Sequence, residues 1–238
     1  ASLFWAKVPG KIEVLNDINR NLCIFYGEIK NNFENLEMMI QSTLHCEATY
    51  KLAKKIYRSK KGYSAVKRAW AVWVGAQMSF GSSIFDGNFK FNSNYVDNSH
   101  PGAVLRNKRN EFLKCFANRL ENVQILNKDA LKIITKFDRE DTFIYIDPPY
   151  FNAHQGHYQG YSLGDFKNLL DILEKSKSKF LLSSYDSDLL REYAERNHWN
   201  MESFTKRCSI NANRLKQNKK DKVEVITYNY NSFQQMLF

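Results

Sequence analysis

The chain has 238 residues and a mass of 28.0 kDa, which suits one α/β domain or a core domain that carries a smaller insert. Hydrophobic residues make up 43% of the chain and aromatic residues 14%, so a packed core can form and intrinsic disorder is excluded as the default state. Lys and Arg number 35 against 25 Asp and Glu, and the resulting formal charge of +10 favours a polyanionic partner, nucleic acid first and an acidic membrane second.

The composition also bears on the compartment. No stretch approaches the roughly 18 to 20 uncharged apolar residues that a membrane span requires, and no basic-then-apolar leader is present. The cysteines are far apart in sequence and form no CxxC pair, which is typical of reduced thiols rather than of a disulfide framework or a zinc ribbon. The sequence therefore predicts a cytoplasmic protein without a membrane span.

Strand and helix patterns alternate along most of the chain. Short apolar or β-branched runs predict strands at residues 11–15, 123–126, 142–146, 179–183, 202–206 and 222–230. Three-and-four spacing of apolar residues predicts helices at residues 22–29, 162–175 and 189–196; in the second of these, Ser162 and Asp165 form a capping pair, and Phe166, Leu169, Leu170 and Leu173 line one face. This βαβ spacing predicts a mostly parallel, Rossmann-like α/β sheet with helices on both faces.

The pattern changes between residues 34 and 110, which we interpret as an inserted, mainly helical subdomain. Residues 48–85 contain no acidic residue, and residues 80–98 are rich in Gly, Ser and Asn, as in a hairpin. Trp70 and Trp73 follow helical spacing and are expected in the core. A second basic run covers residues 206–222. One basic run is usually a solvated face, but two runs beside one pocket favour DNA phosphate contacts, for which the candidates are Lys54, Lys55, Arg58, Lys60, Lys61, Arg68, Arg214 and Lys216.

The strongest chemical signal is Asp147-Pro148-Pro149-Tyr150, directly after the β-branched and aromatic run 142–146. Such a run is typical of a strand buried on both faces, and ligands of open α/β sheets bind outside the carboxyl ends of the strands. Asp147 and the Pro148 carbonyl offer acceptors for the N–H groups of an exocyclic amine, the prolines restrict the turn, and Tyr150 offers a face for a stacked base. Asp-Pro alone is a common turn, but the full tetrapeptide in this context favours a catalytic site.

The tetrapeptide and the motif order resemble the Dam-like, D12 class adenine-N6 DNA methyltransferases, over most of the chain. The resemblance implies a cofactor, S-adenosylmethionine, and a double-stranded DNA partner. Residues 13–19 are similar to the motif that holds the cofactor ribose, which falls on Asp17, with Ile18 against the adenine ring. Residues 126–130 are similar to the next motif, in which Asp129, beside Ala130, receives the adenine amine; Asp147 also faces the cofactor.

The resemblance further implies a closing hairpin with an antiparallel last strand, and a catalytic core of residues 1–33 and 111–238 around the insert 34–110. A lone Asp after a strand is usually a cap or turn residue. Three strand-end carboxylates, at positions 17, 129 and 147, are expected to share one crevice. No metal is expected: the pair His154 and His157 lacks a third ligand at a matching spacing, which favours a loop that contacts DNA phosphate.

Two alternatives stay open at this stage. The family's glycine-rich cofactor loop has no counterpart in these residues, so we expect this chain by itself to bind the cofactor poorly, and a DNA-binding remnant that no longer turns over is one alternative. The other is an amino-methyltransferase that acts on RNA or on protein glutamine, because an Asp-Pro-Pro-Tyr site also serves those amines. The large basic insert favours DNA. The recognition sequence, the oligomeric state, and the existence of a restriction-modification system with a cognate endonuclease are not determined by the sequence.

Overall fold

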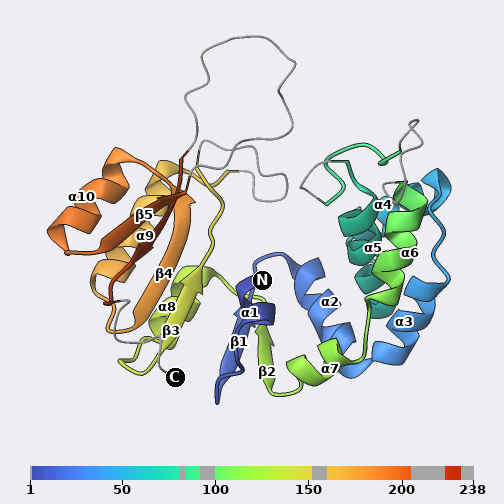
Figure 1. Ribbon diagram of the computed structural model, residues 1–238, viewed down its shortest axis with the longest axis horizontal. Coiled ribbons are helices and arrows are strands. Elements are labelled where there is room, and N and C mark those ends of the chain that lie inside the picture. The colour runs from blue at the N-terminus through green and yellow to red at the C-terminus, as the bar shows by residue number, and fades with distance from the viewer. Residues whose placement is uncertain (1, 81–83, 92–99, 152–159, 205–222, 232–238) are drawn as a thin grey trace, which may run out of the picture. The chain divides into compact units, whose positions relative to one another are not determined.

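The computed structural model describes residues 2–80, 84–91, 100–151, 160–204 and 223–231 (Figure 1). Backbone contacts divide the chain into two compact units, residues 1–130 and 131–238. Each unit has its own cluster of buried side chains. The predicted division, a catalytic core of residues 1–33 and 111–238 around the insert 34–110, stays a prediction. Within the first unit, the helices of the insert share their core with the helix that precedes them.

The first unit combines a small parallel sheet with a group of helices. Its sheet pairs β1 (Glu13–Asn16) with β2 (Val123–Leu126) in parallel, with Asn16 opposite Leu126. Both strands were predicted. Its helices are α1 (Ser2–Ala6), α2 (Arg20–Asn31), α3 (Phe33–Gln41), α4 (Glu47–Arg58), α5 (Ala65–Met78), α6 (Pro101–Asn110) and α7 (Cys115–Leu120).

Helix α5 is the centre of this unit. It is apolar almost all round, so it is buried, with α2, α3, α4 and α6 packed against it. Trp70 and Trp73 are 7% and 5% exposed, as expected of core residues, and the Trp70 indole N–H donates to Thr43 Oγ1 at 2.8 Å. Segment 34–110 is therefore mainly helical, as predicted, but its core is continuous with α2.

An ion pair ties β1 to α7. The Arg119 guanidinium donates to both Glu13 carboxylate oxygens, at 2.6 and 2.9 Å, and also lies over the Phe4 ring. Lys7 makes a further ion pair with Glu13. These cations hold the pKa of Glu13 down, to about 2, against its ordinary 4.5, with the Arg119 hydrogen bond as the largest cause.

The second unit is a four-stranded sheet covered by helices. Its sheet has the order β3 (Phe143–Ile146), β4 (Lys179–Tyr185), β6 (Glu224–Tyr228), β5 (Asn200–Phe204). Strands β3 and β4 are parallel, whereas β6 is antiparallel to both β4 and β5. Its helices are α8 (Ala130–Lys136), α9 (Leu163–Glu174) and α10 (Asp188–Arg196).

The core of this unit lies on one face of its sheet. Alternate residues of β4, Phe180 and Leu182, are buried with Ile146 of β3, Val225 of β6 and the apolar faces of the helices. The predicted face of α9 is fully buried, and the predicted cap is present: Ser162 Oγ accepts from the Asp165 N–H at 3.1 Å while Asp165 accepts from the Ser162 N–H at 2.8 Å.

The prediction that residues 142–146 are buried on both faces is wrong. Phe143 and Tyr145 are 46% and 39% exposed, because side chains alternate between the two faces of the strand and Ile144 and Ile146 occupy the face that packs on the core. The chain is a mixed α/β protein, and one continuous Rossmann-like sheet stays a prediction.

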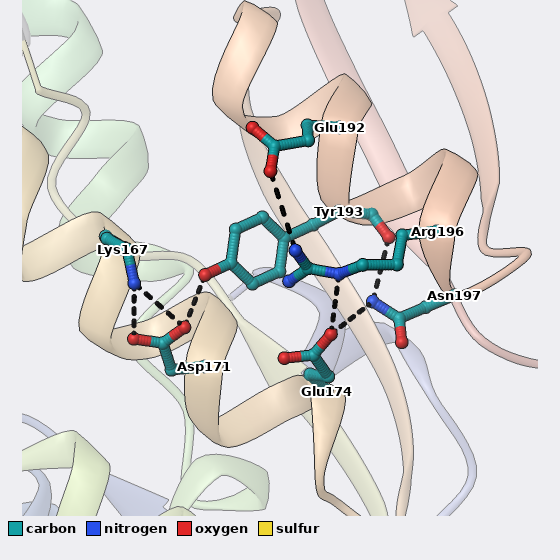
Figure 2. Close-up of polar contacts among 7 residues, drawn as sticks. All are labelled: Lys167, Asp171, Glu174, Glu192, Tyr193, Arg196 and Asn197. Carbon is teal, nitrogen blue, oxygen red and sulfur yellow. Dashed lines mark hydrogen bonds and ion pairs between the residues drawn. The ribbon is translucent and has the colours of Figure 1, made fainter.

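Polar contacts join α9 to α10 (Figure 2). Arg196 Nε lies 2.8 Å from Glu174 Oε1, and Asn197 Nδ2 donates to the same oxygen at 3.2 Å. The Tyr193 hydroxyl donates to Asp171, which also accepts from Lys167. Because α9 precedes β4 and α10 follows it, these contacts fix both connections of the strand that lies beside the tetrapeptide.

Candidate functional site

One candidate site lies in the first unit, at the carboxyl ends of β1 and β2. The two loops that leave these strands are joined by asparagine side chains. Asn16 Oδ1 accepts from the Lys128 N–H at 3.1 Å, and Asn16 Nδ2 donates to the Lys128 carbonyl at 3.0 Å. Asn127 Nδ2 donates to the carbonyls of Asp17 and Ile18, at 2.8 and 2.9 Å. Asn16, the last residue of β1, thus holds the loop that carries Asp129, and Asn127, directly after β2, holds the loop that carries Asp17.

Asp17 is fixed from two further sides. Its Oδ1 accepts from the Asn19 N–H at 2.7 Å, and the Cys23 thiol donates to the Asp17 carbonyl at 3.3 Å and to the Leu126 carbonyl at 3.2 Å. Burial raises the pKa of the Cys23 thiol, and the Asp17 charge adds to that rise. Cys23 is therefore kept as a neutral donor that fastens the loop.

The residues expected to face the cofactor nucleoside are accessible. Ile18 is 62% exposed beside the half-buried Asp17, and Asp129 and Ala130 are exposed after β2. An exposed apolar side chain next to a strand-end carboxylate, with a second carboxylate after the adjacent strand, suits a nucleoside, because carboxylates accept from ribose hydroxyls and from an exocyclic amine while the flat ring contacts the aliphatic group. The acceptors at the ends of β1 and β2 therefore fit the nucleoside end of S-adenosylmethionine.

A second candidate site lies in the second unit, where β3 ends. Asp147 is exposed there, and Pro148, Pro149 and Tyr150 are partly buried. The Tyr150 hydroxyl is hydrogen-bonded to Ser183 Oγ on the adjacent strand β4, at 2.8 Å. The Tyr150 ring makes an edge contact with the Tyr185 ring, with centroids 4.5 Å apart and an interplanar angle of 63°.

Tyr150 is thus held at both ends of its side chain. Burial raises its pKa to about 12, with a smaller contribution from the Asp147 charge, so the phenol is neutral at physiological pH. Beyond it, the Phe151 ring packs on the ring of Phe166 in α9, with 5.1 Å between centroids.

The predicted DNA-binding cations that the structure describes lie on α4, on the connection to α5 and, for Arg68, on α5 itself. Lys55, Arg58, Lys60 and Lys61 are exposed, while Lys54 and Arg68 are half-buried. The opposite face of α4 is buried in the core, so its basic face points away from the core. Arg214 and Lys216, and also His154 and His157, lie outside the described residues.

Two of these arginines also have structural contacts. Arg58 Nη2 donates to the Phe85 carbonyl at 3.3 Å, and Arg68 Nη1 donates to the Ser59 carbonyl at 2.6 Å. The sequence showed no signal for these contacts, because both acceptors are main-chain carbonyls. The arginines therefore have a structural role besides any phosphate contact, and better candidates for phosphate contacts alone are Lys55, Lys60 and Lys61.

The turn-rich segment after α5 forms a hairpin where it is described. Ser79 and Phe89 are bridge partners, and the Phe80 N–H donates to the Asn88 carbonyl at 2.8 Å. A Cβ on Gly87 would lie 1.8 Å from the Phe80 carbonyl oxygen, so only glycine fits at this position. Phe85, at the turn, has a φ of 62° and is fully buried against the rings of Tyr50 and Tyr57.

Comparison with known protein families decides what this constellation is. The family model described as D12 class N6 adenine-specific DNA methyltransferase matches residues 1–214, a range that includes both candidate sites and the basic helix α4. The chain belongs to this family. A search among curated proteins finds no match. The methyltransferase assignment agrees with the resemblance that the Asp147 tetrapeptide indicated.

The described residues were also compared with the requirements of a membrane-spanning helix and of a metal site. Among the residues that the structure describes, no helix is long and apolar enough to cross a bilayer. Within the same residues, no group of three or more His, Cys, Asp or Glu side chains is arranged to hold a metal ion. Asp17 and Asp129 lie in one unit and Asp147 in the other, so the shared crevice stays a prediction.

Proposed function

We propose that this chain transfers a methyl group from S-adenosylmethionine to the N6 amine of a specific adenine in DNA, which is flipped out of the duplex into a pocket at Asp147-Pro148-Pro149-Tyr150. The observation that carries the proposal is the tetrapeptide at the end of β3 with Tyr150 held by Ser183 and Tyr185, in a chain of an adenine methyltransferase family. Flipping is required because N6 is paired inside the duplex.

The catalytic residues act on the target amine. Asp147 and the Pro148 carbonyl accept hydrogen bonds from its two N–H groups, which directs the nitrogen lone pair away from the ring plane and offsets the positive charge that develops on nitrogen. Tyr150 stacks on the base, and Pro149 restricts the turn between them. When bound, the cofactor would supply an electrophilic methyl group, its sulfur would leave as a thioether, and the methylated amine would lose one N–H proton to water. Tyr150 acts as a neutral phenol, because burial raises its pKa to about 12.

Binding of the nucleoside end of the cofactor falls to the candidate site in the first unit. Asp17 accepts from the ribose hydroxyls, Ile18 lies against the adenine ring, and Asp129 with Ala130 receives the adenine amine, while Asp147 borders the methyl donor. The support for these roles is the pair of carboxylates after adjacent parallel strands and the exposure of Ile18.

Double-stranded DNA is the proposed partner, and segment 34–110 with the hairpin after α5 is the proposed recognition subdomain. Lys54, Lys55, Lys60 and Lys61 would contact phosphates, together with Arg58, Arg68, Arg214 and Lys216. A cytoplasmic location and a cognate restriction endonuclease belong to the same proposal.

The test is methyl transfer from labelled S-adenosylmethionine to duplex DNA, to RNA and to a glutamine peptide. Asp147→Ala should abolish transfer while DNA binding persists, whereas Asp141→Ala, which removes an exposed carboxylate just before the same strand, should not. If the labelled methyl group is found only on RNA or only on the peptide, that molecule and not DNA is the substrate. DNA binding without transfer to any acceptor would favour a binding remnant.

A further inference from the structure

The basic helix α4 is hydrogen-bonded to the loop that carries Asp17, through residues that lie 38 positions apart in the sequence. Asn19 Nδ2 donates to the Tyr57 hydroxyl at 2.8 Å, and Asn21 Nδ2 donates to the Tyr57 carbonyl at 3.0 Å. Tyr57 lies in the last turn of α4, next to Arg58 and close to Lys54 and Lys55. The proposed DNA-binding helix and the proposed cofactor carboxylate therefore share one contact point within the first unit.

The contact fixes the orientation of the Asp17 side chain through Asn19. Asn19 is the N-cap of α2, and its Oδ1 accepts from the Asn21 N–H at 3.1 Å. With its Nδ2 bound to Tyr57, the Asn19 side chain is held at both ends. Its backbone N–H then donates to Asp17 Oδ1 at 2.7 Å. A short carboxylate side chain that accepts from a fixed donor loses most of its rotational freedom.

The other side of Tyr57 contacts the hairpin. Its ring packs on the Phe85 ring at 5.3 Å between centroids, and Arg58 donates to the Phe85 carbonyl. Tyr57 is 8% exposed, so its hydroxyl bond to Asn19 is made in a largely buried setting, in which a lost partner is costly. The residue thus joins three parts of the unit: the basic helix, the hairpin and the cofactor loop.

We propose that Tyr57 is a positioning residue for cofactor binding, whose hydroxyl, through Asn19, holds the Asp17 carboxylate in the orientation that receives the cofactor ribose. The inference rests on the proposed role of Asp17. It predicts that removal of one oxygen atom on the DNA-binding helix weakens cofactor binding while the DNA-binding residues themselves are unchanged.

Helix α4 contains a matched control. Tyr50 is also buried, its ring also packs on Phe85 at 5.3 Å, and its hydroxyl donates a hydrogen bond to the Gly87 carbonyl at 2.7 Å. Tyr50→Phe therefore removes a buried tyrosine hydroxyl and its hydrogen bond from the same helix without touching Asn19. A general loss of stability affects both variants, whereas a positioning effect affects Tyr57→Phe alone.

The first readout needs no cofactor. In Tyr57→Phe, hydrogen exchange of the Asn19 amide should quicken about fivefold, the equivalent of one hydrogen bond, and Tyr50→Phe should leave it unchanged. The second readout is calorimetry with S-adenosylmethionine: the dissociation constant should rise about fivefold in Tyr57→Phe and stay at the wild-type value in Tyr50→Phe. Equal effects of the two variants in either readout would overturn the inference.

Asp17→Asn separates this inference from the proposed function. If Asp17→Asn leaves cofactor affinity unchanged, the role proposed for Asp17 is wrong, and the positioning of Asp17 by Tyr57 is still decided by hydrogen exchange. If Asp17→Asn weakens cofactor binding but Tyr57→Phe does not, the proposed function stands and only the role of Tyr57 fails.

Discussion

The hydrogen bond between Tyr150 and Ser183 gives the sharpest prediction about catalysis. The tetrapeptide by itself predicts that Tyr150→Phe is nearly silent, because the ring stacks on the base. The structure adds a cost: the hydroxyl is bonded to Ser183 at 2.8 Å, and Phe cannot make this bond. Since both side chains are partly exposed, water can replace the lost partner, so the cost is about 0.5–1.5 kcal/mol.

Removal of the whole ring should cost more. Tyr150→Ala loses the stacking on the base, about 1–3 kcal/mol, and the edge contact with Tyr185, about 0.5–1.5 kcal/mol. At about 1.4 kcal/mol for each factor of ten, we expect kcat/KM to fall about threefold to tenfold in Tyr150→Phe and at least about tenfold more in Tyr150→Ala.

The assay is a double-mutant cycle on kcat/KM for methyl transfer to duplex DNA. Tyr150→Phe and Ser183→Ala remove the same bond from opposite sides, so the double variant should be little worse than either single variant, with a coupling energy near 1 kcal/mol. Additive losses would refute the positioning of Tyr150 by Ser183. A loss in Tyr150→Phe as large as in Tyr150→Ala would refute base stacking as the main role of the ring.

Two further predictions concern stability and DNA binding. Arg119 and Lys7 hold the folded pKa of Glu13 at about 2, below its ordinary 4.5, so the contribution of the Glu13 carboxylate to stability is fully present above pH 4.5 and is lost as the pH falls through 2. The free energies of urea unfolding of wild type and Glu13→Gln should therefore differ at pH 7 and converge near pH 2, and a constant difference would exclude ionisation as the cause. The second change replaces four lysines by Gln: Lys54, Lys55, Lys60 and Lys61. The slope of log affinity against log salt should flatten by about 0.9 for each true phosphate contact, and the affinity for all DNA sequences should fall alike. An unchanged slope would exclude these lysines from the DNA interface.

Several local features could be predicted because they depend on short segments. The capping pair Ser162 and Asp165, the apolar face of α9 and the strands before Asp17 and Asp147 all follow from neighbours within a few residues. The tetrapeptide is equally local, and it indicated the methyltransferase family that the comparison then showed. The paired endings Asn16-Asp17 and Asn127-Lys128-Asp129 were a further signal, since asparagines at matching strand ends can hold each other's loops.

The sequence by itself determined which residue types lie at the strand ends, which segments are rich in positive charge, and which helix faces are apolar. These properties follow directly from the order and spacing of the residues. Only the tertiary structure decided which distant groups meet. Asn19 reaches Tyr57, Ser183 reaches Tyr150, and Arg58 is partly committed to Phe85, through contacts between segments 27 to 38 residues apart. Hydrogen bonds between side chains distant in sequence produce no periodic pattern of residue types. The position of β3 at the edge of its sheet depends on which strands pair with one another, so both features could be identified only in the folded chain.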